Sequence, residues 1–297
     1  MNRRTLILTA LAVIFSTFSL AHAKDEEKSH KVISYNCWYV FNHKKEITAG
    51  TKWLKEQNAD VVALQELTNI KPEYLSTLAK GWDHPHTALL KTSGFSVGIT
   101  SKEPIKVVEK QLKGMHHGYM HVTIKDVHYF LVHLSPFKHE VRTREAKILT
   151  AKIQPLIQAK EKVIVLGDFN AVSESDHDLL AKQKDLIKNK TETDKKHGHV
   201  QNLKDGKLDF GAMDVFDKAG LIDSAKGHLA NKADIRFSIP TGVWTDKKTP
   251  PTEGERIDYI LTDPLLSKMI KAVSIPKEGV LNKVSDHYPV VVEFGKK

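Results

Sequence analysis

The chain has 297 residues, a single cysteine and a formal net charge of +9, from 45 Lys and Arg against 36 Asp and Glu. The lone Cys37 excludes an intrachain disulfide and a zinc site built from cysteines. A hydrophobic content of 40% permits a sizeable core, so burial of apolar side chains must hold the fold together. The positive net charge favours an anionic partner such as nucleic acid or acidic lipid, but it does not distinguish between the two.

The N-terminal segment has the features of a secretory signal peptide. Arg3 and Arg4 supply the positive start, residues 6–20 the apolar stretch, and residues 21–23 a small-x-small cleavage site. The alternative is an uncleaved membrane anchor, but the apolar run is short for a bilayer span and charged residues follow it at once. We therefore expect export to the periplasm or the extracellular space, with residues 1–23 removed by cleavage after Ala23.

Strand and helix patterns alternate along the remaining chain. Short apolar runs predict strands, and apolar residues spaced three or four apart predict helices. Strands are expected over 31–36, 61–65, 86–90, 95–100, 118–124, 127–133, 163–166, 256–261 and 288–294. Helices are expected over 43–58, over 138–159 and from Pro72 onward, where a first-turn proline is well tolerated.

Two polar segments interrupt this alternation. Residues 176–208 are lysine-rich and short of periodic apolar positions, which predicts an insertion or surface loop. Residues 231–254, with clustered Pro and Thr, predict a second long loop. No solenoid-like repeat and no dividing linker is present, so we expect residues 24–297 to form one domain.

Polar residues recur at the ends of the predicted strands. Asn36, Glu66, His133, Asp168 and Asn170 all follow apolar strand segments closely. Any one of them could simply begin a turn, since Asn and Asp favour turns. The ends of strands are also where open sheets build their functional sites, because rigid elements hold side chains that still reach solvent. The repetition of the pattern therefore indicates a shared site.

Four segments carry a family resemblance: VALQE at 62–66, GDFNA at 167–171, RIDYI at 256–260 and SDHYPV at 285–290. In this order they resemble the endonuclease/exonuclease/phosphatase superfamily, which includes deoxyribonuclease I, apurinic endonucleases, inositol polyphosphate 5-phosphatases and neutral sphingomyelinases. Matching segments run from Ser34 to Val292. The resemblance implies an α/β (α+β) fold like that of deoxyribonuclease I, a four-layer sandwich of two packed mixed β-sheets flanked by helices.

The resemblance also implies hydrolysis of phosphate esters with a magnesium ion. Mg²⁺ prefers oxygen ligands, and the family pattern assigns Glu66 and Asp286 to it, with Mn²⁺ or Ca²⁺ as substitutes. Asp168 would orient the attacking water and take its proton. Asn170 would hold that water or a phosphate oxygen.

The family pattern further implies donors for the phosphoryl oxygens, namely His287, His133 and Asn36. His287 would act as an imidazolium with Asp258 as its partner, because a nearby carboxylate raises the pKa of an imidazole. Two alternatives stay open. Asp258 could instead pair with Arg256 or another cation, and His133 could be a satisfied histidine at the end of a core strand.

Several other features have weaker interpretations. The histidines at 116–117 and at 197 and 199 have no acid or cysteine nearby at ligand spacing, so we expect no metal there, although the 115–119 loop could touch substrate. Trp38, Tyr39 and Phe41 could stack on a base or a lipid headgroup, or could pack in the core or at its rim.

These observations favour an exported, metal-dependent phosphodiesterase that attacks with water in line, and a nuclease first of all. The alternative is a sphingomyelinase-like or inositol-phosphate phosphoesterase, because the same catalytic residues would serve either substrate. A non-catalytic binding protein on this scaffold ranks last, since no member of the residue set is missing. We expect a monomer with an anionic phosphodiester substrate, nucleic acid or, second, a membrane lipid.

Overall fold

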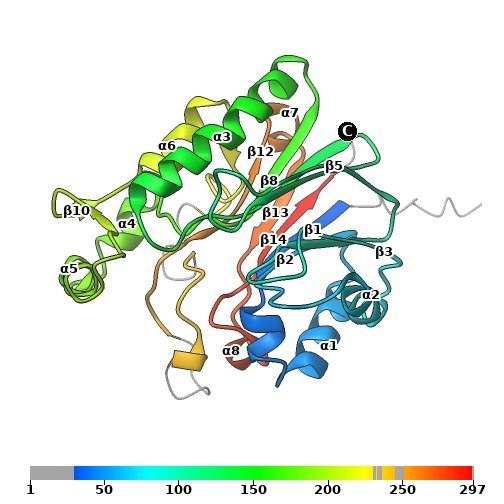
Figure 1. The fold of residues 1–297 in the computed structure, drawn as a ribbon, viewed down its shortest axis with the longest axis horizontal. Helices are drawn as coiled ribbons and strands as arrows, with labels where there is room; N and C mark the ends of the chain where they lie inside the picture. The colour runs from blue at the N-terminus through cyan, green and yellow to red at the C-terminus, as the bar shows by residue number, and fades with distance from the viewer. Residues whose placement is uncertain (1–29, 230–231, 233–235, 245–250, 296–297) are drawn as a thin grey trace, which may run out of the picture.

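The computed structural model describes residues 30–229, 232, 236–244 and 251–295; the expected signal peptide over 1–23 lies outside them. Two six-stranded sheets pack on each other, and helices cover their outer sides (Figure 1). The expected fold class, two packed mixed β-sheets flanked by helices, is confirmed. Among the described helices, none has the length and apolar character needed to span a membrane.

The first sheet has the strand order β13-β14-β1-β2-β4-β3. Its central strands β1 and β2 are parallel, and the other neighbours are antiparallel. Helices α1 (Ile47–Gln57) and α2 (Pro72–Lys80) lie beside this sheet (Figure 1). The strands are β1 (His30–Asn36), β2 (Val61–Gln65), β3 (His86–Leu89), β4 (Gly98–Ser101), β13 (Ile270–Ser274) and β14 (Val290–Phe294).

The second sheet has the order β11-β12-β8-β7-β6-β5 and a parallel pair, β7 and β8, at its centre. Helices α3 (His139–Gln158) and α6 (Gly211–Lys218) cover its outer face (Figure 1). The strands are β5 (Ile105–Gln111), β6 (Tyr119–Ile124), β7 (Val127–His133), β8 (Lys162–Asp168), β11 (Ile222–Asp223) and β12 (Asp258–Thr262).

Strand β8 shows how the alternation of side chains separates the two cores. Ile164 and Leu166 belong to the core that also contains strands of the first sheet, whereas Val163 and Val165 pack beneath α3 and α6. A strand buried on both faces carries apolar residues at every position, as this segment does. Asp168 lies two residues beyond Leu166, so its side chain continues the face that looks towards the other sheet.

Residues 176–208, expected to form an insertion or a surface loop, contain regular structure, so the loop alternative is wrong. These residues form α4 (His177–Leu180), α5 (Leu186–Lys196) and a hairpin of β9 (Leu203–Lys204) and β10 (Lys207–Leu208). Leu180 and Leu186 pack in a small cluster with Ile257, and too few such residues are present to produce a periodic signal. The second expected loop lies partly outside the described residues.

Several short elements were not predicted from the sequence. Most of them bury few apolar residues each. In the edge strand β5, apolar and polar residues alternate only weakly. The sequence pattern alone therefore does not reveal these elements. They are β5, β11, β13, α6, α7 (Pro264–Ser267), α8 (Leu281–Val284), η2 (Glu174–Asp176) and η4 (Gly242–Trp244).

The helix predicted over 43–58 begins only at Ile47, because a left-handed turn precedes it. Residues 38–44 all have positive φ, between 41° and 66°, a conformation that costs roughly 1–2 kcal/mol per non-glycine residue. Phe41 anchors the turn in the core against Gly50, where an added Cβ would lie 2.6 Å from its ring. The Val40 amide donates to the Glu66 carbonyl oxygen at 3.2 Å. The turn, which includes η1 (Trp38–Asn42), is thus tied to the strand ends.

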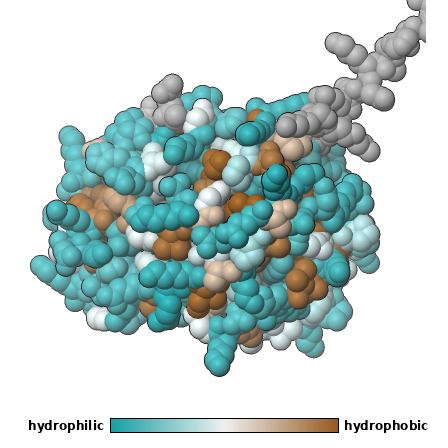
Figure 2. Space-filling model, turned by 90° about the horizontal axis from the view of Figure 1, so that it is seen from above, coloured by the Kyte–Doolittle hydropathy of each residue, from teal (hydrophilic) through white to brown (hydrophobic). Residues whose placement is uncertain are grey.

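Six large apolar side chains are exposed on the described surface, among them the consecutive Val107 and Val108. The face in Figure 2 is mainly hydrophilic, with hydrophobic residues scattered over it. Scattered exposure of this kind is normal for a folded protein. The exposed large hydrophobics are Val107, Val108, Leu112, Ile187, Trp244 and Leu265.

A substitution at Gly167 tests whether strands β8 and β7 approach each other closely at this position. The φ of Gly167 is +146°, and an added Cβ would lie 1.9 Å from the Val132 carbonyl oxygen. We expect Gly167→Ala to lower the free energy of unfolding by roughly 2–4 kcal/mol. The control Gly206→Ala, at φ +73° with no heavy atom within 4 Å, should cost about 1 kcal/mol. Urea denaturation measures both; equal costs would contradict the tight strand contact.

His121 should make the fold sensitive to acid. Its ring stacks on Phe130 at 4.1 Å, and burial, followed by the charge of His128, lowers the pKa of His121 to about 4. The unfolded side chain titrates near about 6.5. Between these values the unfolded chain binds a proton that the folded chain does not, so stability falls as pH drops through this window. His121→Phe keeps the stack and should reduce the loss of Tm between neutral and acidic buffer; an unchanged loss would contradict the assignment.

Candidate active site

Three of the predicted site residues lie side by side at the end of the second sheet. His133 on β7 and Asp258 on β12 are each in register with Asp168 on β8. Each shares the inward face of its strand with apolar core residues two positions away, namely Leu131, Ile260 and Leu166. The core between the sheets therefore ends in a polar layer.

The first sheet supplies the residues opposite. Asn36 ends β1, in register with Gln65 of β2, and Glu66 follows directly. Asp286 and His287 come just before β14, whose Val290 pairs with β1. Because parallel β1 and β2 end where antiparallel β14 begins, these side chains meet at one edge. The structure thus brings all eight predicted site residues together.

Asp168 is the centre of this cluster and is only 2% exposed. Its Oδ2 accepts a hydrogen bond from Asn36 Nδ2 at 3.0 Å, and its Oδ1 accepts one from the Asn170 amide at 2.8 Å. His133 Nε2 lies 3.4 Å from Oδ2. Burial, followed by the charge of Asp258, raises the pKa of Asp168 to about 7. A carboxylate with this pKa is suited to accept a proton near neutral pH.

His287 is paired with Asp258, whose Oδ2 lies 2.8 Å from its Nδ1. Burial alone would lower the pKa of His287, but the Asp258 carboxylate, with Asp168 and Asp286, raises it well above the usual range. The alternative of an Asp258–Arg256 ion pair does not form. Arg256 instead binds Asp176, at 2.8 Å from Nε, together with Asp223.

His133 is in a different electrostatic state. Burial, followed by the charges of His117 and His287, lowers its pKa well below the usual range. Its ring stacks on His117 with centroids 4.2 Å apart. Within the described part of the chain, its Nδ1 is buried without a hydrogen-bond partner. A neutral imidazole with a free polar edge can bind a ligand group that has yet to enter.

Glu66 and Asp286 suit a hard cation. Both line the pocket of the site, and burial raises the pKa of both carboxyls. Glu66 Oε2 is also buried with no partner among the described residues. A divalent cation would offset the cost of holding two such carboxylates together. We conclude that these residues fit a metal ion.

A second acidic group has metal-like spacing. Asp168, Asp258 and His287 offer ligand atoms within 4.8 Å of one another. However, Asp258 and His287 already hydrogen-bond to each other at 2.8 Å, and a protonated imidazole cannot ligate a metal. Glu66 and Asp286 are therefore the better candidates.

The sequence matches a known family of proteins. The model of the endonuclease/exonuclease/phosphatase family matches residues 33–287. The chain belongs to this family. None of the curated proteins matches the sequence.

Solved structures of similar fold include nucleases. An AP endonuclease from Archaeoglobus fulgidus has a TM-score of 0.65 at 18% identity, covering 89% of this chain and 99% of that one. The 3′ phosphatase NExo from Neisseria, bound to a product DNA hairpin, has a TM-score of 0.65 at 18% identity, covering 90% and 100%. The 3′-5′ exonuclease NExo from Neisseria meningitidis has a TM-score of 0.64 at 20% identity with the same coverage. At these identities the likeness concerns the fold.

In this family member, the site opens into a pocket of about 340 Å³ with an aromatic side. Trp38 and Tyr39 line it, whereas Phe41 is buried in the core. Sequence reasoning missed Phe95 and Phe137, which give no pattern beyond their aromatic character. It considered the histidines at 116–117 only as a loop that could touch substrate, and both line the pocket.

A buried acid, Glu145 of α3, holds two pocket loops in place. One carboxylate oxygen accepts a hydrogen bond from the His116 amide, and the other accepts one from the Ser135 amide at 2.8 Å. Because α3 is packed on the second sheet, the two loops are fixed relative to the strand ends.

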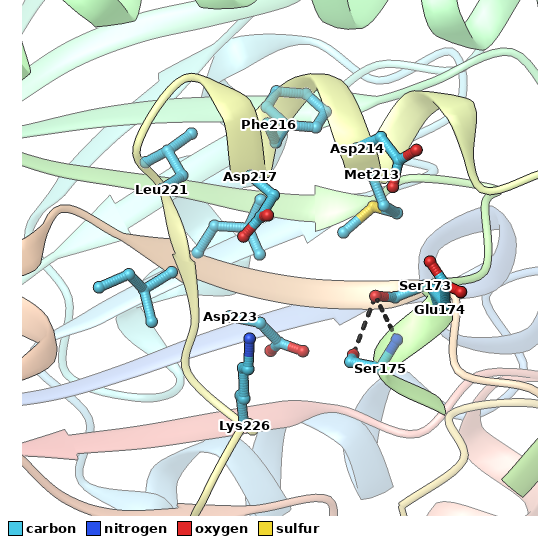
Figure 3. Close-up of a pocket in the computed structure, with 12 residues that line it drawn as sticks. Ser173, Glu174, Ser175, Met213, Asp214, Phe216, Asp217, Leu221, Asp223 and Lys226 are labelled. Atoms are coloured by element: carbon cyan, nitrogen blue, oxygen red, sulfur yellow. Dashed lines mark hydrogen bonds between the residues drawn. The ribbon is translucent and has the colours of Figure 1, made fainter. Parts of the chain in front are cut away.

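Another cavity, of about 370 Å³, lies between α6 and the β11–β12 edge (Figure 3). Its lining includes acids and Lys226, and Ser173 and Ser175 hydrogen-bond at its rim. Asp223, which points into it, is held by Arg256. The lining contains no histidine and no amide side chain, so it lacks the acid–imidazole–amide combination found at the strand ends.

Glu145→Gln should loosen the pocket loops while the sheets stay folded. An amide side chain has only one acceptor oxygen, so one buried backbone N–H would lose its partner. We expect a loss of roughly 1–3 kcal/mol in the free energy of unfolding, together with faster hydrogen exchange at Ser135 and His116. Hydrogen-exchange mass spectrometry measures the second effect. Unchanged exchange in these loops would show that Glu145 does not hold them.

Proposed function

We propose that this chain is an exported, metal-dependent phosphodiesterase that hydrolyses nucleic acid. The observation that carries the proposal is the contact of Asp168 with Asn36, Asn170, His133 and His287 at the mouth of the two sheets. Family membership supports a hydrolase acting on phosphoester bonds. The excess of basic over acidic residues, +9 over the full chain, and the DNA hairpin bound by the Neisseria phosphatase support nucleic acid as the substrate.

In the proposed reaction, water attacks phosphorus in line as the bond to the leaving oxygen breaks. Asp168 takes the proton of the attacking water, for which a pKa of about 7 is well suited. Asn36 and Asn170 hold the carboxylate in position through the 3.0 Å and 2.8 Å hydrogen bonds to its two oxygens.

His287 and His133 would bind the phosphoryl oxygens. The Asp258 partner occupies Nδ1 of His287, so its Nε2–H is the group that can donate to an oxygen on which negative charge develops. His133 would contribute a neutral imidazole edge. Glu66 and Asp286 would hold the cation, Mg²⁺ or in its place Mn²⁺ or Ca²⁺, which when bound would neutralise part of the phosphoryl charge.

A phosphocholine-lipid substrate is the second candidate, because one exposed tryptophan lies near the pocket. Trp244 is 64% exposed, and its ring is 5.8 Å from that of Trp38, a pocket-lining residue. Tryptophan at a rim of this kind suits a membrane–water interface. Export is also part of the proposal and rests on the signal-peptide features of the N-terminal segment. A monomeric state is part of it as well and rests on the size of the chain's own hydrophobic core.

Asp168→Asn tests the proposed base directly. The amide keeps the size of the side chain but cannot accept a proton, so hydrolysis of a short DNA or RNA strand with Mg²⁺ should fall by about 10²–10⁴-fold. Asp217→Asn on the exposed side of α6 is the matched control and should keep full activity.

The same assay tests the metal. Excess chelator should stop turnover by the unchanged protein, and added Mg²⁺ should restore it. Sphingomyelin vesicles and inositol phosphates complete the substrate panel. Turnover that is equal with and without chelator would contradict the metal-dependent mechanism.

A further inference from the structure

Three rings form a continuous wall from the pocket rim to the cluster of acids and histidines. Tyr39 and Phe95 have centroids 5.1 Å apart, Phe95 and His117 are 5.4 Å apart, and His117 stacks on His133 at 4.2 Å. We name Tyr39, Phe95 and His117 the ring wall. They come from three separate loops, after β1, before β4 and before β6, and all line the same pocket.

None of the three has a role in the chemistry proposed above. Phe95 has no ionisable group, and burial, followed by the charge of His116, lowers the pKa of His117 to about 3. The ring wall therefore presents uncharged faces and edges. The inner end of the ring wall lies beside His133, whose Nε2 is 3.4 Å from Asp168 Oδ2. A ligand bound to the ring wall therefore lies next to Asp168, the proposed base.

Flat, neutral rings beside a phosphoryl site are suited to a nucleobase. Bases stack on aromatic side chains whatever their sequence, because every base has a π-face. Inside a duplex, however, both faces of a base are covered by its neighbours. A base must leave the stack to reach rings that line a concave pocket. The pocket of about 340 Å³ is such a recess rather than a protruding surface.

We propose that the ring wall binds an unpaired nucleobase next to the scissile phosphate, so that the preferred substrate is single-stranded or locally unpaired nucleic acid. This inference rests on the proposed function and specifies its substrate. The polar edges in the pocket favour a base over a trimethylammonium headgroup. A base has edge atoms that can hydrogen-bond to polar groups of the pocket, whereas a quaternary ammonium offers no hydrogen bond.

The test combines a change in the protein with a change in the substrate. One substrate is a labelled single strand, and the second carries abasic tetrahydrofuran residues around the cleavage position. Stacking would be lost in the second, so the unchanged protein should show a KM about tenfold higher on it, with kcat little altered. Phe95→Leu should raise KM about tenfold on the normal strand and hardly at all on the abasic one.

Two further variants make the comparison specific. Tyr39→Leu removes the rim ring and should behave like Phe95→Leu; it carries the test if the Phe95 variant fails to fold by circular dichroism. Tyr74→Leu removes a half-buried ring on α2, outside the pocket, and should leave both KM values unchanged.

Several results would overturn the inference. Equal losses on normal and abasic strands would show that the rings support the loops rather than bind a base. Faster cleavage of a fully paired hairpin than of the single strand, or a preference for sphingomyelin vesicles that Phe95→Leu abolishes, would also reject it. If the protein cleaves no phosphodiester, or if cleavage does not depend on Asp168, the proposed function itself fails. If cleavage depends on Asp168 but is equal on normal and abasic strands, only the role of the ring wall is rejected.

Discussion

The burial of the Asp168 carboxylate is the constraint on which the site depends. A carboxylate removed from water is costly unless donors surround it. Here donors come from both sheets: the Asn36 amide from the first and the Asn170 backbone N–H from the second. The packing of one sheet on the other therefore sets the chemistry of the pocket. A shift of either sheet would leave Asp168 charged, buried and unpaired, or would expose it to water.

Two histidines near this carboxylate are driven in opposite directions by their surroundings. His287 has Asp258 against one nitrogen, so its positive form is favoured in spite of burial. His133 stacks on another imidazole, and its burial, followed by the charges of His117 and His287, lowers its pKa, so its neutral form is favoured. Such a divergence of pKa values within one pocket is a sign of divided roles. Asp258 can serve His287 because Asp176 and Asp223 neutralise the neighbouring Arg256.

Unfavourable backbone conformations gather around the same pocket. Glu66 and Asn170 have positive φ, as do residues 38–44, which carry Trp38 and Tyr39 to the rim. Strain of this kind persists only where the surrounding structure holds it. The buried Phe41 and the Val40–Glu66 backbone bond hold the turn here. The core thus stabilises a conformation that presents rings and carboxylates towards a ligand.

Local patterns in the chain were sufficient for the main strands, for helix α3 and for five polar residues at strand ends, Asn36, Glu66, His133, Asp168 and Asn170, because a buried strand requires an uninterrupted apolar run and a polar residue marks its end. Asp258, Asp286 and His287 were identified only through the family resemblance. The resemblance also added the proposed roles of all eight residues, which stay predictions. Three things required the tertiary structure: the helices within 176–208, the partner of Asp258 and the ring wall. Tyr39, Phe95 and His117 belong to loops far apart in the sequence, and no local periodicity records which loops meet. Their proximity follows from the register of the strands and from sheet-on-sheet packing, which are interactions between distant segments.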